Sequence, residues 1–270
     1  MKNQNENLPV ISSKVAELKR EVQKLNTEIS MLLLERDELR FVVCRNIETA
    51  YMLSLGALEF KAYELYCKVL RLKRKLAIIT AKKNRQGKID LDRIEKTLDE
   101  EFAEYKKQLD EQVKKMNEAI EYSKLERLTE EEEKEFKKLY RQIVKALHPD
   151  LNPNVTENEI KLFQNAVEAY KNGDLKTLRF ISTLISSVSP DEPKENILEH
   201  LQRERERLEN IIGQINEQIS KIKTEYPYTL KEFTESSQKR EARKAEIEET
   251  IEQLKAAYQY YINEINESLR

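Results

Sequence analysis

The chain has 270 residues with a formal net charge of -2, 36% of its residues are charged, and it contains only 4 Gly, 6 Pro and no Trp. Few turn residues combined with abundant Leu, Glu, Lys and Ile are typical of long helices and coiled coils, so we expect an all-α fold. The near balance of 48 basic and 50 acidic side chains gives no global field toward nucleic acid or an anionic membrane, and neither is expected as a partner.

Several functional classes lack their sequence signals. Residues 1–7 are polar, with no apolar core after a basic start, so we expect no signal peptide. No uninterrupted apolar stretch approaches the ~20 residues needed to cross a bilayer. Cys44 and Cys67 have neither Cys-x-x-Cys nor Cys/His ligand spacing, which indicates reduced thiols and no bound metal. Since a nucleophile elbow and a phosphate-binding Gly loop are also missing, we expect a cytoplasmic protein that is not an enzyme and has no cofactor.

The N-terminal part of the chain is expected to be a polar tail, residues 1–9, followed by a long helical hairpin over residues 10–122. The first helix of the hairpin carries apolar side chains in alternating steps of three and four, the seam of a coiled coil. These side chains are Val15, Leu18, Val22, Leu25, Ile29 and Leu32. Asn84 and Gly87 mark the turn, and Asp90 or Asp92 can cap the returning helix.

A basic cluster surrounds this turn. Its members are Arg71, Lys73, Arg74, Lys75, Lys82, Lys83, Arg85 and Lys88. The cluster could bind nucleic acid or an acidic protein through phosphate-type contacts. A solvated hairpin tip is the favoured interpretation, because no stacking aromatic side chains are interleaved with the basic ones.

A short amphipathic helix is predicted to begin at a capping box formed by Thr129 and Glu132. One face of this helix is apolar and should be buried. That face consists of Phe136, Leu139, Tyr140, Ile143, Val144 and Leu147. The opposite face is a basic stripe that should meet solvent or a partner. The stripe consists of Lys134, Lys137, Lys138, Arg141 and Lys145.

Pro149 disfavours helical geometry at the preceding residue, so this helix should end near His148. A second capping box, Thr156 with Glu159, starts another helix that should close at Gly173. The apolar seam of that second helix consists of Ile160, Phe163, Val167 and Tyr170. The sequence therefore predicts a small antiparallel hairpin with His148-Pro149-Asp150 at its tip, followed by a further helix that Asp174 caps and that extends through Ser187.

The C-terminal part is expected to be a linker, residues 189–194, and a second helical hairpin over residues 195–270. Its heptad-like seam stops at Pro227 and a helical pattern resumes from Leu230. Each hairpin alone would expose a long apolar seam. The two hairpins can therefore pack together as one stalk, or the chain can self-associate as a homodimer, and the sequence does not separate these arrangements.

The run from Phe136 to Pro153, with Phe163 and Glu168-Ala169-Tyr170, resembles helix II, the loop and helix III of a J domain, the co-chaperone module of Hsp70 proteins. The expected module spans residues 123–188. The resemblance implies that the His-Pro-Asp loop and the basic face of helix II bind the ATPase domain of a DnaK-type Hsp70 and stimulate ATP hydrolysis. The implied binding residues are His148, Pro149, Asp150, Lys137, Lys138, Arg141 and Lys145. The implied module core is Phe136, Leu139, Tyr140, Ile143, Val144, Leu147, Phe163, Val167 and Tyr170.

The chain departs from the J-domain pattern in places. Gln142 stands where family members often have Lys, and the usual helix I is not evident, so residues 120–128 would have to substitute for it. Absence of a Gly/Phe-rich segment and of a zinc module places the resemblance with the divergent class of J proteins.

Two functions follow from these readings. One is an Hsp70 co-chaperone whose coiled-coil stalk binds a client or partner protein. The other is a structural or adaptor coiled-coil protein with a vestigial J-like module, in which His148 merely caps its helix and Asp150 accepts local hydrogen bonds.

Overall fold

The structure is a computed structural model that describes residues 7–125, 128–185 and 197–270, and every regular element in these ranges is helical. This confirms the predicted all-α class. The chain forms two compact units, each assembled from two separate segments. Unit 1 comprises Met1–Arg45 and Glu126–Tyr228, and unit 2 comprises Asn46–Leu125 and Thr229–Arg270.

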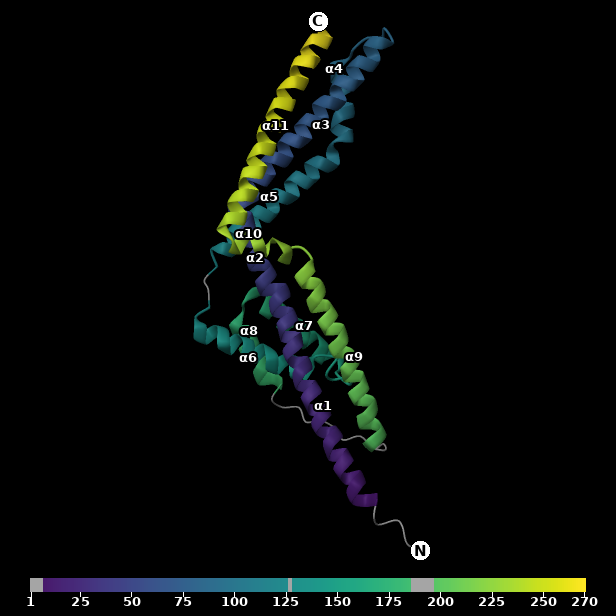
Figure 1. The fold of residues 1–270 in the computed structure, drawn as a ribbon, viewed down its shortest axis with the longest axis vertical. Helices are drawn as coiled ribbons and strands as arrows, with labels where there is room; N and C mark the ends of the chain where they lie inside the picture. Colours follow the sequence, from purple (N-terminus) through teal and green to yellow (C-terminus); the bar gives the residue numbers. More distant parts are fainter. Residues whose placement is uncertain (1–6, 126–127, 186–196) are drawn as a thin grey trace. The chain divides into compact units, whose positions relative to one another are not determined.

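Unit 1 is built from two long helices and three short ones. The long helices are α1 (Asn7–Glu38), which runs directly into a π-helical turn (Leu39–Val43), and α9 (Ile197–Thr224). The short helices are α6 (Glu130–Leu147), α7 (Glu157–Asn172) and α8 (Leu175–Ile185). Helix α1 lies along α9 and also contacts α6, while α6, α7 and α8 pack on one another (Figure 1).

One hydrophobic core holds all five helices of unit 1 together. Ile29 and Leu33 of α1 and Leu208 of α9 are fully buried in the same cluster as the apolar faces of α6, α7 and α8. The core of the expected module, residues 123–188, is therefore continuous with side chains of α1 and α9. Leu128, from the stretch expected to substitute for helix I, also packs against this core.

The side chains assigned to the module core all belong to this cluster. The buried ones are Phe136, Tyr140, Ile143, Val144, Leu147 and Tyr170. The half-buried ones, which pack around the first group, are Leu139, Phe163 and Val167. The helical spacing thus selected the residues that face the interior of unit 1.

Unit 2 is organised by α3 (Ala57–Asn84) and α11 (Ser237–Leu269), which lie side by side (Figure 1). Helix α2 (Cys44–Tyr51) contains the boundary between the units, and a π-helical turn (Met52–Gly56) joins α2 to α3. Helices α4 (Leu91–Glu101) and α5 (Ala103–Ser123) return along α3, with the turn where it was predicted. Asp90 caps α4 by accepting a hydrogen bond from the Arg93 amide. The short α10 (Lys231–Glu235) precedes α11.

The long helices pair differently from the expected hairpins. Residues 10–122 and 195–270 are each divided between the units, because α1 packs with α9 and α3 packs with α11. A heptad seam specifies that a helix needs an apolar partner but not which helix supplies it. Of the expected tail, residues 1–6 lie outside the described residues and α1 begins at Asn7. The expected linker, residues 189–194, and Ser187 also lie outside them.

The shared core gives a first prediction. Leu208→Ala should lower the free energy of unfolding of unit 1 by about 2–5 kcal/mol, because it leaves a cavity where a fully buried side chain stood. Urea unfolding measures the loss of unfolding free energy, and native-state hydrogen exchange shows which helices are destabilised. We expect amides of α6, α7 and α8 to lose protection together with those of α9. Leu184→Ala, at an exposed position of α8, is the control. Unchanged protection in α6 to α8 would show that these helices are stable by themselves.

Candidate functional site

The site begins with the two ends of α6. Thr129 Oγ1 accepts a hydrogen bond of 3.2 Å from the Glu132 amide, and Glu132 accepts one of 3.0 Å from the Thr129 amide. The bond from the Thr129 amide to the Glu132 carboxylate lowers the pKa of Glu132, and the two bonds together fix the start of the helix. At the other end, His148 is the C-cap, and its amide donates to the carbonyl of Val144. The predicted capping box and the predicted end of the helix are both confirmed.

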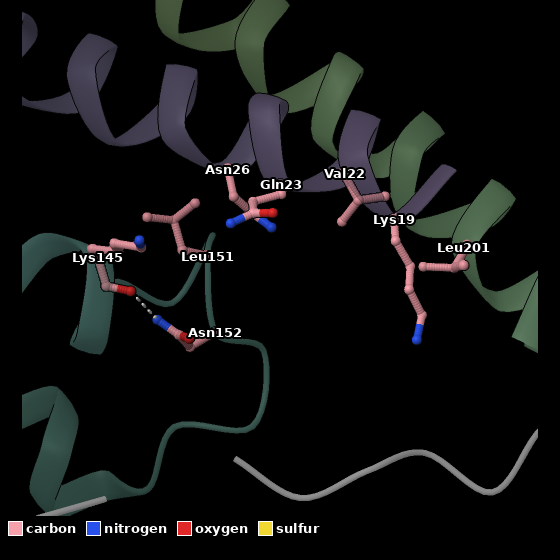
Figure 2. A pocket seen from close by; sticks show the side chains of 8 residues that line it. All are labelled: Lys19, Val22, Gln23, Asn26, Lys145, Leu151, Asn152 and Leu201. Carbon is pink, nitrogen blue, oxygen red and sulfur yellow. Dashed lines mark hydrogen bonds between the residues drawn. The ribbon is translucent and has the colours of Figure 1, made fainter. Parts of the chain in front are cut away.

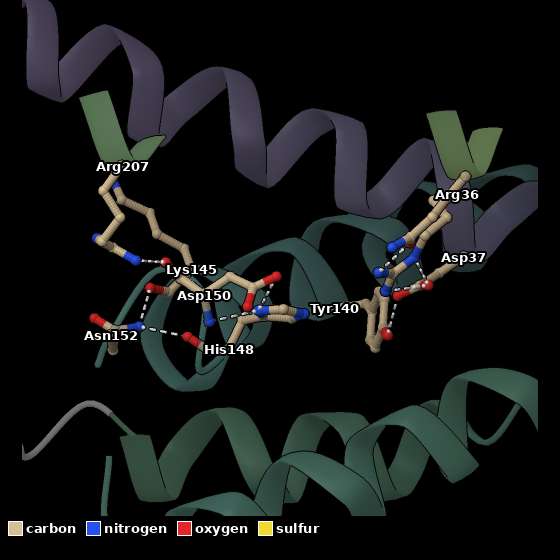
Figure 3. A network of polar contacts seen from close by, with 9 residues as sticks. Arg36, Asp37, Tyr140, Lys145, His148, Asp150, Asn152 and Arg207 are labelled. Atoms are coloured by element: carbon tan, nitrogen blue, oxygen red, sulfur yellow. Dashed lines mark hydrogen bonds and ion pairs between the residues drawn. The ribbon is translucent and has the colours of Figure 1, made fainter. Parts of the chain in front are cut away.

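The loop after α6 is closed by its own hydrogen bonds (Figure 3). The Asp150 amide donates to Nδ1 of His148 at 3.1 Å. The amides of Leu151 and Asn152 both donate to the His148 carbonyl, at 3.0 and 2.9 Å. The Asn152 side chain donates to the Lys145 carbonyl at 3.0 Å. A loop with this many internal bonds has little freedom to rearrange locally.

Helix α7 follows the loop and runs antiparallel to α6. It begins at the predicted capping box of Thr156 and Glu159 and ends at Gly173, whose φ of 70° places it in the left-handed region. Near the loop, the ring of His148 meets Phe163 edge-on, with centroids 5.1 Å apart. Toward the far end, Tyr140 stacks on Tyr170 at 4.0 Å. The predicted antiparallel pairing of these two helices is confirmed.

His148 is not presented at a free tip, as the sequence suggested, because its side chain is only 10% exposed. Burial lowers the pKa of His148, although the nearby carboxylate of Asp150, with an oxygen 3.8 Å from Nδ1, favours the charged form. Because Nδ1 accepts the Asp150 amide, the neutral ring carries its proton on Nε2. Pro149 is exposed, and the Asp150 side chain is 47% exposed. The loop therefore offers its proline and carboxylate to solvent and covers its imidazole.

Tyr140 joins α6 to α1. Its hydroxyl donates a 2.7 Å hydrogen bond to Asp37, whose side chain is only 2% exposed. Arg36 binds the other oxygen of this carboxylate at 2.7 Å. Burial first, and the charge of Asp37 second, raise the pKa of Tyr140. Sequence reasoning did not identify Asp37, although an acidic residue within an apolar-rich stretch of α1 was a signal that a buried partner was needed.

The predicted basic stripe is divided by the structure. Lys137 is half-buried and forms ion pairs with Glu38 at 2.6 Å and Glu133 at 2.9 Å, which outweigh burial and raise its pKa. Arg141 is also half-buried. Three members of the basic stripe remain exposed. Together with Gln142 and Pro149 they follow one line along α6, at steps of three and four residues, that leads to the loop. This exposed stripe consists of Lys134, Lys138, Gln142, Lys145 and Pro149.

Arg207 contacts the loop from α9, a helix that is not one of the group α6, α7 and α8 (Figure 3). It donates to the backbone carbonyl of Asp150 at 2.7 Å. Its guanidinium is held by a two-point ion pair with Glu204, one turn earlier on the same helix. This ion pair opposes the effect of burial and raises the pKa of Arg207. Arg207 therefore binds the backbone carbonyl of Asp150 and not its carboxylate.

A pocket lies beside the loop (Figure 2). It is lined by Lys19, Val22, Gln23, Asn26, Lys145, Leu151, Asn152 and Leu201. These residues come from α1, the end of α6, the loop and α9. Oδ1 of Asn26 is buried there and has no hydrogen-bond partner among the described residues.

Other candidate groups have structural roles. In the basic cluster of unit 2, Arg71 binds Glu95 and Asp99, and Arg74 binds Glu101. These ion pairs join α3 to α4, which favours the reading of the cluster as part of the hairpin. Cys44 and Cys67 are both buried. Across residues 7–125, 128–185 and 197–270, no three His, Cys, Asp or Glu side chains are grouped as metal ligands would be.

No described helix is both long enough and apolar enough to cross a membrane.

Comparison with known proteins returned no relative. No protein-family model matches the chain, and neither a curated protein nor a solved structure matches it.

The burial of His148 gives a prediction about pH. A His with a lowered pKa contributes stability that is complete above its unfolded pKa, 6.5, and is lost as the pH falls toward the folded value. The free energy of unfolding of unit 1, measured by urea titration, should therefore fall as the pH drops below about 6.5. His148→Gln should flatten this dependence, whereas His200→Gln should retain it. An equal slope in both variants would contradict the assignment to His148.

Proposed function

We propose that this chain is a co-chaperone that recruits a DnaK-type Hsp70 and stimulates its ATPase through the His148-Pro149-Asp150 loop. The observation that carries the proposal is the J-type sequence of residues 136–153 together with Phe163 and Glu168-Ala169-Tyr170. A closed loop between two capped, antiparallel helices is consistent with such a role. The chain would act by binding, and the Hsp70 would supply the catalytic groups.

The exposed stripe suggests how the partner would be attracted. Lys134, Lys138 and Lys145 are exposed along α6 and lead to Pro149, beside the half-exposed carboxylate of Asp150. A row of positive charges accelerates association with an acidic surface and orients the encounter. We therefore assign the first contact to Lys138, Lys145 and the loop, and a smaller share to Lys137 and Arg141, which are half-buried.

Client or partner binding is proposed for the long helices. In unit 2, Tyr66 of α3 and Tyr260 of α11 are 44% and 56% exposed. Aromatic side chains of this kind are enriched where proteins bind one another.

A second candidate function is that of a structural or adaptor protein, in which α6 to α8 serve only to pack unit 1. Burial of His148 and the ion pair between Lys137 and Glu38 favour it. In that case the loop would be a helix connection, and its residues would matter for stability alone.

The deciding experiment is single-turnover ATP hydrolysis by a cytosolic Hsp70 with the wild-type chain and with His148→Gln. We expect the wild type to accelerate hydrolysis and the variant to lose the acceleration while remaining folded by circular dichroism. His200→Gln is the matched control and should behave as the wild type. Equal acceleration by His148→Gln would remove the role from the loop. No acceleration of any Hsp70, including that of the native host, would favour the adaptor function.

Gln142→Lys tests the exposed stripe. It adds a positive charge between Lys138 and Lys145, and we expect it to raise the association rate with Hsp70 by about two- to five-fold at low salt. The gain should disappear at high salt because the charges are exposed. Gln164→Lys, at an exposed position of α7, adds the same charge elsewhere. An equal gain from both variants would indicate a non-specific charge effect.

A further inference from the structure

Three polar contacts tie α1 and α9 to the proposed Hsp70-binding elements. Asp37 of α1 accepts the hydroxyl of Tyr140, and Glu38, the next residue of α1, pairs with Lys137. Arg207 of α9 binds the Asp150 carbonyl. Figure 3 shows the first and third of these contacts at opposite sides of the loop and α6. All three lie within unit 1, and together they extend from the first half of α6 to the loop.

The imidazole of His148, in the same part of unit 1, is buried. The His148 ring packs against Phe163, its Nδ1 accepts a hydrogen bond from the Asp150 amide, and it lies near the charges of Arg36 and Asp37 on α1. Its side chain is therefore almost inaccessible to another protein. The ammonium group of Lys137 is likewise neutralised by two carboxylates. Two of the groups that the proposed function needs are thus occupied within the chain itself.

We propose that α1 and α9 form an inhibitory clamp on the His-Pro-Asp loop. The described structure is the closed form of unit 1, and Hsp70 binds an open form in which Lys137 is released from Glu38 and the loop is released from Arg207. This inference rests on the proposed co-chaperone function and assigns its regulation.

The clamp has one strong contact and two weaker ones. Separating Tyr140 from Asp37 would leave a buried carboxylate short of a partner, which is costly. The ion pair of Glu38 with Lys137 joins side chains that are about one-third exposed, 31% and 34%, where ion pairs are weak. The Arg207 contact is also only partly buried. Opening can therefore start at Glu38 and Arg207 without unfolding the core.

The test weakens these two contacts together in the full-length chain. Glu38→Gln/Arg207→Gln removes one negative and one positive charge, so the net charge stays constant. The matched control is Glu35→Gln/Lys221→Gln, which also removes one charge of each sign from α1 and α9. Glu35 pairs with Lys223 across these helices and Lys221 with Glu225, so neither contacts the loop.

The release variant should populate the open form more than the wild type does. At subsaturating concentration we expect about three- to ten-fold greater stimulation of Hsp70 ATP hydrolysis, in proportion to the larger open fraction. Without any Hsp70, the amides of Asp150 and Leu151 should exchange faster by a similar factor. The control variant should match the wild type in both measurements. Adding His148→Gln to the release variant should abolish its stimulation.

A crosslink tests the same clamp in the opposite direction. The side-chain ends of Glu38 and Lys137 meet at 2.6 Å, so Glu38→Cys/Lys137→Cys can be joined by a short bismaleimide. Cys44 and Cys67 are buried, which directs the reagent to the introduced thiols. The unjoined variant lacks the Lys137 ammonium group and should stimulate less than the wild type, and joining the two thiols should abolish the stimulation that is left. Equal stimulation by the joined and unjoined proteins would overturn the clamp.

The outcomes separate the clamp from the function on which it rests. If the wild type stimulates Hsp70 and the release variant gives neither more stimulation nor faster exchange, the clamp is wrong and the co-chaperone function stands. If neither protein stimulates any Hsp70 although exchange is faster in the release variant, the co-chaperone function fails and the inhibitory role fails with it.

Discussion

Unit 1 depends on the hydrogen bond between Tyr140 and Asp37. A carboxylate with 2% exposure is stable only if its oxygens are bound, and here Tyr140 of α6 and the neighbouring Arg36 bind them. The same Tyr140 stacks on Tyr170 of α7. One side chain therefore connects a long helix to both helices that flank the His-Pro-Asp loop, and the apolar contacts of Ile29, Leu33 and Leu208 consolidate that arrangement. Through this bond, α1 is fixed against α6, the helix that leads into the loop.

Local features of unit 1 could be predicted from the sequence because their causes are local. Thr129 and Thr156 each have a Glu three residues later, and both pairs form the capping boxes that this spacing predicts. Pro149 ends α6 at Leu147, and Gly173 ends α7 in the left-handed region. The apolar spacing of α6 and α7 selects side chains that the core contains. Each of these signals lies within a few residues of its effect.

Features that depend on distant parts of the chain could not be predicted. The seam of α1 would fit any helix with a similar seam, and only the folded chain shows that α9 fills it. Burial of His148 could not be read from its neighbours in sequence, since the ring packs against Phe163 of the next helix. Glu38 and Arg207 stand among many charged residues on exposed helical faces, so nothing marks them as partners of Lys137 and Asp150. The motif located the candidate site in the sequence, but it did not reveal that the His148 side chain is buried.

The two-segment construction of each unit also constrains how the chain folds during synthesis. Helices α1, α6, α7 and α8 leave the ribosome before α9, so the loop exists before Arg207, which lies 57 residues beyond Asp150. Leu208, which is fully buried in the finished core, is also missing from that early intermediate. In the same way, α3 is synthesised before α11, the helix against which it packs. Contacts this distant in sequence slow folding and leave apolar surface exposed until the later helix has been synthesised. The nascent chain therefore passes through a stage in which its own unfinished helices are candidates for chaperone binding.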